Sequence, residues 1–356
     1  MSIYVTISSY CDPLLPQTLK DAYQKAKYPD QLFFGVVDQT PIGYPSKLPR
    51  VVPKDQMQYL HIDSRMARGP CWARAMGMSM MGRQDYFLQL DSHMLFDQDW
   101  DETLLQRAAM CEQFNEKFVI SCYPPRWDYK DGKPVKTTGP DVVFANVISP
   151  GGKFDAEGNP WLPIMPRRLS GLALTEGFAL GAGFIFAPGR IVNEIPYDPF
   201  LYFLGEEQSL AVRLFTSGWD IFHVVGVPIY HLYALPDGAE APVKRPKHWE
   251  EQQDKGRALR WWRYDKRSKR RLKILFSKDA SDLGVYGLGS ERTLGDFAEF
   301  SGIDYLRRRL DRKAFGEAWH EQGYATSLSD ENRKKIAEAL KGQPRRAPRR
   351  ALPPAK

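Results

Sequence analysis

The residues best suited to chemistry are an aspartate and a histidine two positions apart, Asp91 and His93, directly after the apolar run 86–90. On an extended chain such residues point to the same side, so both side chains can reach one cation while Ser92 points away. A carboxylate oxygen with an imidazole nitrogen suits Mn²⁺, and also Zn²⁺ or Fe²⁺. The alternative is a loop aspartate that caps the next helix and a histidine that hydrogen-bonds nearby.

A third ligand candidate is His231, which lies in the aromatic and apolar segment 227–233. A single histidine on such a strand is also compatible with a core residue whose hydrogen bonds are satisfied. Together with Asp91 and His93 it would form an Asp/His/His set. Such a set leaves coordination positions open for phosphate oxygens, as catalytic metal sites require.

Two adjacent glutamates, Glu206 and Glu207, begin a segment of helical spacing that ends at Ser217 and Gly218. Acidic side chains in a first helical turn are favoured by the helix dipole, which requires no function. The functional interpretation is that one glutamate faces the reacting group of a substrate while the other caps the helix.

Basic side chains and glycines supply further candidates. Arg65, Arg68 and Arg74 precede the Asp91 strand, and arginine is the planar donor for phosphate, so we expect one of them to contact a diphosphate. Ordinary surface charge is the alternative. Three glycines lack the G-x-G-x-x-G spacing of a dinucleotide fold and indicate either backbone close to a ligand or a tight turn: Gly177, Gly181 and Gly183.

The elements that must position these residues alternate between strands and helices. A strand at 3–8, a helix at 14–27 and a buried strand at 32–37 form a βαβ opening, which favours an α/β fold with a parallel sheet. In open α/β sheets ligands bind beyond the carboxyl ends of strands, which is where Asp91 and His93 lie. Further elements are predicted as strands at 57–62, 85–90, 117–122 and 220–225, and as helices at 69–81, 101–115, 205–217, 249–276, 294–315 and 331–340. The segment 123–172, rich in Pro, Gly and charge, is expected to be irregular and functional.

Of the 356 residues, 43% are hydrophobic, which is typical of a globular protein. Charge is divided unevenly along the chain. The net charge of +7 is the sum of −6 over 1–240 and +13 over 241–356. Between 257 and 273, basic and aromatic residues alternate, which predicts either a nucleic-acid or polyanion contact or a solvated helix whose tryptophans pack on the main domain. Four scattered cysteines, no signal peptide and no apolar run of about 18 residues predict a cytoplasmic protein without a membrane contact.

Several motifs resemble glycosyltransferase family 60, whose members transfer N-acetylglucosamine to hydroxyproline or Ser/Thr of proteins. They are Ile-Ser-Ser-Tyr-Cys-Asp-Pro (7–13), His-Ile-Asp-Ser-Arg (61–65), Gly-Pro-Cys-Trp-Ala-Arg (69–74), Tyr-Phe-Leu-Gln-Leu-Asp-Ser-His-Met (86–94) and Phe-Leu-Gly-Glu-Glu-Gln (203–208), with later matches at 286–294 and 297–304. The Asp-Ser-His set is also similar to the Asp-x-His motif of polypeptide N-acetylgalactosaminyltransferases. In those enzymes a later histidine completes the metal site, and Glu206 is the better match to their single glutamate.

This resemblance implies a GT-A fold, an α/β architecture with a Rossmann-like mixed sheet flanked by helices, followed by a basic helical segment and a disordered tail. The implied catalytic domain spans 1–240, with a nucleotide-sugar part at about 1–125 and an acceptor part at about 126–240. A basic, mainly helical extension at 241–325 packs on it, and a terminal helix with a Pro/Arg-rich tail occupies 326–356.

The same resemblance implies a retaining enzyme that uses a UDP-sugar donor, UDP-GlcNAc or a related hexose, with Mn²⁺. The implied donor-binding residues are Ser8, Tyr10, Asp12, Arg65, Arg74 and Asp91. The implied metal ligands are Asp91, His93 and His231, and the implied catalytic residues are Glu206 and Glu207.

The sequence leaves more than one acceptor and more than one function open. A protein hydroxyl is the expected acceptor, and a hydroxymethylated base in DNA is the alternative. A non-catalytic nucleic-acid-binding protein that uses the basic segment is a further reading, as is a sugar-nucleotide binding module. A metal-dependent hydrolase is less supported, because the chain has no H-E-x-x-H motif.

Overall fold

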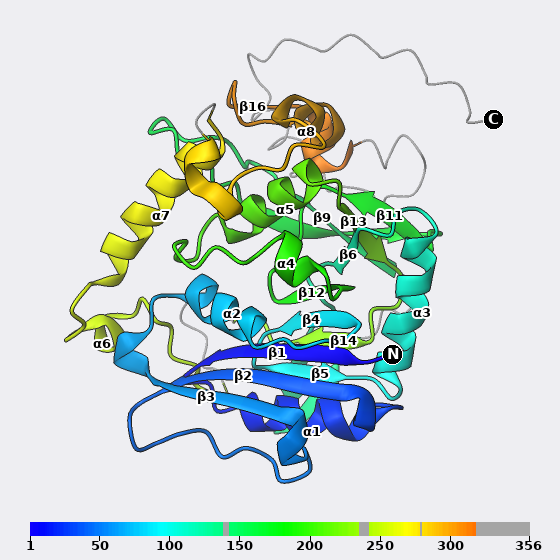
Figure 1. Cartoon of the computed structure of the whole chain (residues 1–356), viewed down its shortest axis with the longest axis vertical. Coiled ribbons are helices and arrows are strands. Elements are labelled where there is room, and N and C mark those ends of the chain that lie inside the picture. The colour runs from blue at the N-terminus through cyan, green and yellow to red at the C-terminus, as the bar shows by residue number, and fades with distance from the viewer. Residues whose placement is uncertain (138–141, 235–241, 278–279, 318–356) are drawn as a thin grey trace.

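The structure of the chain is a computed structural model that describes residues 1–137, 142–234, 242–277 and 280–317. Its centre is an eight-stranded mixed sheet flanked by helices (Figure 1), as the sequence predicts. In sheet order the strands are β11 (Leu174–Gly177), β13 (Asp220–Val224), β6 (Phe118–Ser121), β12 (Phe184–Pro188), β4 (Tyr86–Leu90), β1 (Ile3–Tyr10), β2 (Leu32–Thr40) and β3 (Met57–Asp63).

Strand direction divides the sheet into a parallel part and a mixed part. Strands β1 to β4 pair in parallel, which confirms the βαβ opening. Strand β12 then lies antiparallel between β4 and β6, and β11 lies antiparallel to β13 at the edge. The carboxyl ends of β1, β2 and β4 therefore meet at one edge of the sheet, where Tyr10 ends β1 and Asp91 follows β4.

Successive strand residues point to opposite sides of the sheet, so both faces carry apolar side chains. Helices cover both of these faces. Tyr4 and Phe87 belong to one hydrophobic cluster, whereas their neighbours Val5 and Leu88 belong to the other. The first face is covered by α2 (Pro70–Ser79) and α5 (Glu206–Thr216), and the second by α1 (Leu15–Lys25) and α3 (Trp100–Glu112). The remaining helices are α4 (Ile191–Glu194), α6 (Glu251–Asp254), α7 (Trp261–Leu275) and α8 (Leu294–Ser301).

The segment expected to be irregular, 123–172, contains two antiparallel hairpins, so that expectation is wrong. They are β7 (Trp127–Lys130) with β8 (Lys133–Lys136), and β9 (Val142–Ile148) with β10 (Ile164–Ser170). The first hairpin turns at Asp131-Gly132, where both residues have positive φ. An Asp-Gly pair is a favoured two-residue hairpin turn, so this signal was present in the sequence.

Two predicted helices are shorter than expected because glycines with positive φ interrupt them. The predicted helix at 249–276 is divided into α6 and α7, with Gly256 at φ +87° between them. The predicted helix at 294–315 ends at Gly302, also at positive φ, and is followed by the short pair β15 (Ile303–Asp304) and β16 (Arg309–Leu310). The helix predicted at 331–340 and the tail lie outside the described residues.

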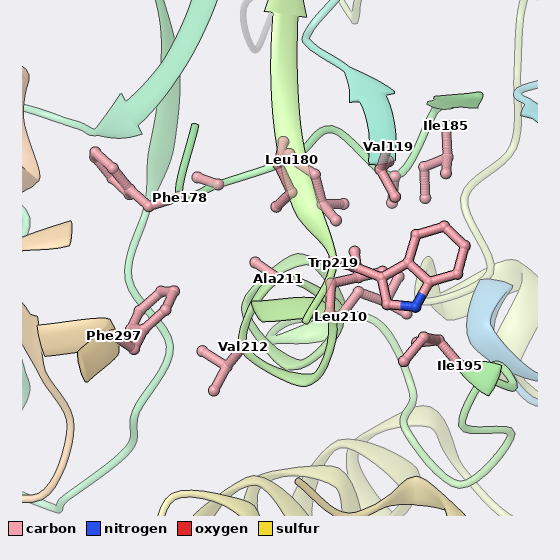
Figure 2. Packing of buried hydrophobic residues seen from close by; sticks show 14 of the residues in the cluster. Val119, Phe178, Leu180, Ile185, Ile195, Leu210, Ala211, Val212, Trp219 and Phe297 are labelled. Atoms are coloured by element: carbon pink, nitrogen blue, oxygen red, sulfur yellow. The ribbon is translucent and has the colours of Figure 1, made fainter. Parts of the chain in front are cut away.

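The C-terminal helices share a core with the sheet. Leu272 and Phe297, from α7 and α8, belong to the same buried cluster as Leu210 and Val212 of α5. Figure 2 shows Phe297 beside Val212, with Phe178 above it. The basic segment therefore presents its apolar side to the main body. Across the described residues, no helix combines the length and apolar character needed to cross a membrane.

Candidate active site

A short strand pair brings the two halves of the predicted metal set together. Strand β5 (Met94–Phe96) follows His93 directly, and it pairs antiparallel with β14 (Ile229–His231). In this register His231 lies opposite Met94, so the two histidines are neighbours although 138 positions separate them. The apolar segment around His231 is thus a strand whose last residue turns toward the end of β4.

Asp91, His93 and His231 form a compact group of potential ligands. Their ligand atoms all lie within 4.8 Å of one another. Nε2 of His231 is 3.0 Å from Nε2 of His93 and 3.1 Å from Oδ2 of Asp91. The structure therefore brings together all three residues that the sequence analysis selected as metal ligands.

The chemistry of this group fits a divalent cation. Two imidazole Nε2 atoms that face each other at 3.0 Å cannot both carry a proton without repulsion, and a bound cation would accept both lone pairs. Asp12 Oδ2 lies 2.7 Å from Nδ1 of His93, which holds the ring so that Nε2 faces the group. A carboxylate behind a ligating histidine is the usual supporting arrangement at metal sites.

Arg74 joins two carboxylates of the site. Its Nη2 donates to Oδ1 of Asp91 and its Nη1 donates to Oε1 of Glu206, each at 2.6 Å. Burial alone would raise the pKa of Asp91, but the Arg74 charge and the hydrogen bond with His231 hold that pKa well below its usual range. Asp91 is therefore a carboxylate at any ordinary pH, as a cation ligand must be.

The two glutamates at the start of α5 have different surroundings. Glu206 is buried, and its Oε1 also accepts from the hydroxyl of Tyr197. Glu207 accepts from the hydroxyl of Tyr123 at 2.6 Å and from the backbone N–H of Ala182 at 3.0 Å. Burial, together with the nearby Glu206 charge, raises the pKa of Glu207 to about 7.

These groups surround a cavity of about 320 Å³. Asp91, His231 and both glutamates line it, together with Tyr123. Gly183 also lines it, and a Cβ at this position would lie 2.6 Å from Oδ2 of Asp91, so the absence of a side chain here leaves room for the carboxylate. Gly183 thus lies at the cavity, whereas the carbonyl of Gly181 accepts from the backbone N–H of Phe184 at 3.0 Å in a tight turn.

The expected donor-binding residues divide between this cavity and a smaller one. Ser8 and Tyr10, both in the last part of β1, line a cavity of about 50 Å³ at the carboxyl end of that strand. Oδ2 of Asp12, by contrast, lies 2.7 Å from Nδ1 of His93 and accepts a hydrogen bond from the hydroxyl of Ser92, also at 2.7 Å. Arg65 is exposed, pairs with Asp63 and lines neither cavity.

Sequence reasoning missed two residues of the basic extension, one that lines the smaller cavity and one that hydrogen-bonds to a residue lining it. His248 lines it, and Arg257 donates from Nη2 to the hydroxyl of Tyr10 at 2.6 Å. Arg257 is buried, and it also donates to the backbone carbonyls of His248 and Ser64. In the sequence both residues belong to a segment that reads as surface charge, and no spacing connects them to Tyr10.

An α/β chain with a mixed sheet of this topology and a carboxylate–histidine group at the strand ends has the GT-A-like fold of a glycosyltransferase. The family model described as Glycosyltransferase (GlcNAc) matches residues 43–307, and the chain belongs to this family. The match extends through α7 and α8.

A solved structure supports the same fold. The crystal structure of GalNAc-T7 with UDP, GalNAc and Mn²⁺ is similar to this chain with a TM-score of 0.50 and 13% sequence identity. The similarity covers 90% of this chain and 58% of that chain, so this chain corresponds to only part of GalNAc-T7. No curated protein matches the sequence.

Proposed function

We propose that the protein is a metal-dependent, retaining glycosyltransferase that moves N-acetylglucosamine from UDP-GlcNAc to a hydroxyl group of Ser, Thr or hydroxyproline in a polypeptide. The observation that carries this proposal is the convergence of Asp91, His93 and His231 beside a cavity that Glu207 also lines. The motifs shared with glycosyltransferase family 60 support the sugar and the acceptor. The GalNAc-T7 structure, which contains UDP and Mn²⁺, supports the donor class and the cation.

In this proposal Asp91, His93 and His231 hold Mn²⁺. The bound cation would neutralise the negative charge that develops on the departing diphosphate. Asp12 keeps His93 in the orientation that points Nε2 toward the other ligands, which is a positioning role. Asp12 therefore supports the metal site, and of the three residues expected to contact the uridine, Ser8 and Tyr10 remain, because they line the cavity at the carboxyl end of β1.

Arg74 and Glu206 act as positioning residues for Asp91. Arg74 is engaged by a carboxylate on each side, so its guanidinium fixes the rotamer of Asp91 and connects it to the start of α5. Glu206 is buried behind this pair and completes the network with Tyr197. The sequence motif favoured Glu206 as the sugar-facing glutamate, whereas these contacts support Glu207 in that role.

Glu207 is the group that faces the sugar. Its hydrogen bonds with Tyr123 and with the Ala182 N–H fix the carboxyl group at the cavity wall. There it orients the sugar and stabilises the positive charge that develops at C1 as the bond to the phosphate oxygen breaks. The acceptor oxygen forms its bond to C1 on the same face, and its proton passes to the departing phosphate oxygen. No covalent sugar–enzyme bond is needed.

A donor screen tests this function. The full chain is incubated with Mn²⁺ and with UDP-GlcNAc, UDP-GalNAc or UDP-glucose, and UDP release is measured with and without EDTA. We expect UDP-GlcNAc to be hydrolysed fastest, and we expect both EDTA and Asp91→Ala to abolish the release. Turnover that survives in Asp91→Ala would contradict the metal assignment, and equal rates for all donors would contradict the sugar assignment.

The acceptor is tested separately. With the preferred donor, hydroxyproline-containing and Ser/Thr-containing polypeptides are compared with DNA that carries hydroxymethylated bases, and mass spectrometry reads the added sugar. We expect modification of the polypeptide. Modification of DNA alone would transfer the proposal to the nucleic-acid acceptor.

A further inference from the structure

A second hollow lies on the opposite side of the loop that leads into α5. The segment 199–205 contributes Phe203 and Gly205 to the active-site cavity, but Phe200 and Tyr202 to this hollow. Its volume is about 600 Å³, within the range of ligand sites and larger than the active-site cavity. We call it the α2/α7 groove, and its main lining residues are Arg68, Trp72, Phe200, Tyr264, Arg267 and Arg270.

Unpaired positive charge marks the rim of the α2/α7 groove. Arg68, Arg267 and Arg270 are exposed and form no ion pair within the part of the chain that the structure describes. Arg271, the fourth arginine of the groove, is neutralised by Asp198. Arg267 and Arg270 are three positions apart on α7, so they lie on the same face of the helix. Among the described residues that line the groove there is no carboxylate, so the groove favours an acidic occupant.

The aromatic rings of the groove are already in contact with other groups on their faces. The guanidinium of Arg68 lies 5.3 Å from the centre of the Trp72 ring, and Arg271 lies 5.0 Å from that of Phe200. The guanidinium groups cover ring faces on which bases of single-stranded nucleic acid would stack, whereas apolar side chains of a polypeptide can pack against the ring edges. Aromatic residues together with arginine are typical of protein-binding surfaces, where arginine binds carboxylates with two hydrogen bonds.

The charge of the chain's own C-terminal stretch does not suit this groove. Residues 342–356 contain arginine and lysine but neither aspartate nor glutamate. Two segments of like charge repel, so this stretch is not a suitable occupant of the groove.

We propose that the α2/α7 groove binds an acidic segment of a partner polypeptide, with carboxylates on Arg68, Arg267 and Arg270 and apolar side chains against Trp72 and Phe200. The proposal goes beyond sugar transfer, because it assigns a second binding surface separated from the active-site cavity by the loop 199–205. Binding there requires neither the donor nor the cation.

Fluorescence anisotropy tests the proposal with the full chain and a fluorescein-labelled peptide of Glu, Asp and Leu. The variant is Arg267→Glu/Arg270→Glu. The matched control is Lys20→Glu/Lys54→Glu, which changes the net charge equally at exposed positions of α1 and of the turn before β3. We expect the groove variant to weaken peptide binding at least about tenfold and the control to leave it nearly unchanged. Phe200→Ala, at an exposed position, should also weaken it.

Three results would overturn the proposal. The first is that the unaltered protein does not bind the peptide. The second is that the groove variant and the control lose peptide binding equally. The third is that labelled oligothymidylate or phosphatidylserine vesicles bind in a way that depends on Arg267 and Arg270, while the peptide does not bind. UDP release from UDP-GlcNAc is measured in every variant and should stay unchanged. Because peptide binding is read without turnover, its failure is distinguishable from a failure of the proposed sugar transfer.

Discussion

Oδ2 of Asp12 lies 2.7 Å from Nδ1 of His93, although the two residues follow different strands of the sheet. Asp12 comes just after β1 and His93 just after β4, and these strands pair in parallel, so their carboxyl ends bring the two side chains together. The same Oδ2 accepts from Ser92, and Oδ1 accepts from the backbone N–H of Leu14. This carboxylate is thereby fixed on three sides and fixes the imidazole in turn.

Replacing Asp12 should therefore weaken metal binding without removing a ligand. Asp12→Asn keeps the size of the side chain but loses the charge that orients His93. We expect the affinity for Mn²⁺ to fall by about 10- to 100-fold, the usual effect of losing such a supporting group. Calorimetric titration with Mn²⁺ in the presence of UDP measures it. Asp30→Asn, at an exposed carboxylate, is the control, and an unchanged affinity in Asp12→Asn would remove the positioning role.

The two glutamates of α5 should respond differently to the same substitution. Glu206→Gln removes the charge that Arg74 meets in a buried pair, and breaking such a pair costs about 3 kcal/mol of unfolding free energy. Glu207→Gln should instead lower kcat for UDP release strongly, and it leaves the ion pair of Arg74 with Glu206 intact, so it should not destabilise the fold. Urea unfolding and turnover are measured for both variants. Similar, mild effects in both would mean that neither glutamate faces the sugar.

The raised pKa of Glu207 predicts how stability depends on pH. Its pKa moves from 4.5 to about 7 in the folded chain, so folding favours the protonated form. This contribution is complete below about pH 4.5 and is lost as the pH rises through about 7. Between about pH 5 and 8 the unaltered protein should lose up to about 3 kcal/mol relative to Glu207→Gln. Urea unfolding of both proteins at several pH values checks this, and parallel pH curves would contradict it.

Gly183 should be sensitive to the smallest possible side chain. In Gly183→Ala the new Cβ would lie 2.6 Å from Oδ2 of Asp91, so the carboxylate must move away from His231. We expect weaker Mn²⁺ binding and slower UDP release, with secondary structure retained by circular dichroism. Gly82→Ala is the matched control, because there the nearest atom is 3.4 Å away at the end of the Gln84 side chain. Equal behaviour of the two variants would show that the space beside Asp91 is unimportant.

Sequence patterns predicted the ordered part of this architecture because strands and helices leave a local signal. The βαβ opening and the position of Asp91 after β4 follow from apolar periodicity alone. Apolar periodicity does not predict that His231 lies beside Asp91 and His93, because this depends on the register of two three-residue strands, β5 and β14.

Contacts between distant segments account for what the sequence analysis missed. The roles of Asp12 and of Arg257 depend on loops that meet only in the folded chain, and no spacing in the sequence connects them to His93 or Tyr10. Likewise, the difference between Glu206 and Glu207 arises from their partners Arg74 and Tyr123, which come from other elements.

Whether Asp91, His93 and His231 form one cation site is tested most directly by titrating the protein with Mn²⁺ in the presence of UDP. Electron paramagnetic resonance detects the bound Mn²⁺, and the same titration is carried out on His231→Ala. We expect one bound Mn²⁺ per unaltered chain, and a large loss of both Mn²⁺ binding and UDP-GlcNAc hydrolysis when His231 is replaced. Mn²⁺ binding and hydrolysis that persist undiminished in His231→Ala would contradict the claim that Asp91, His93 and His231 together hold the catalytic cation.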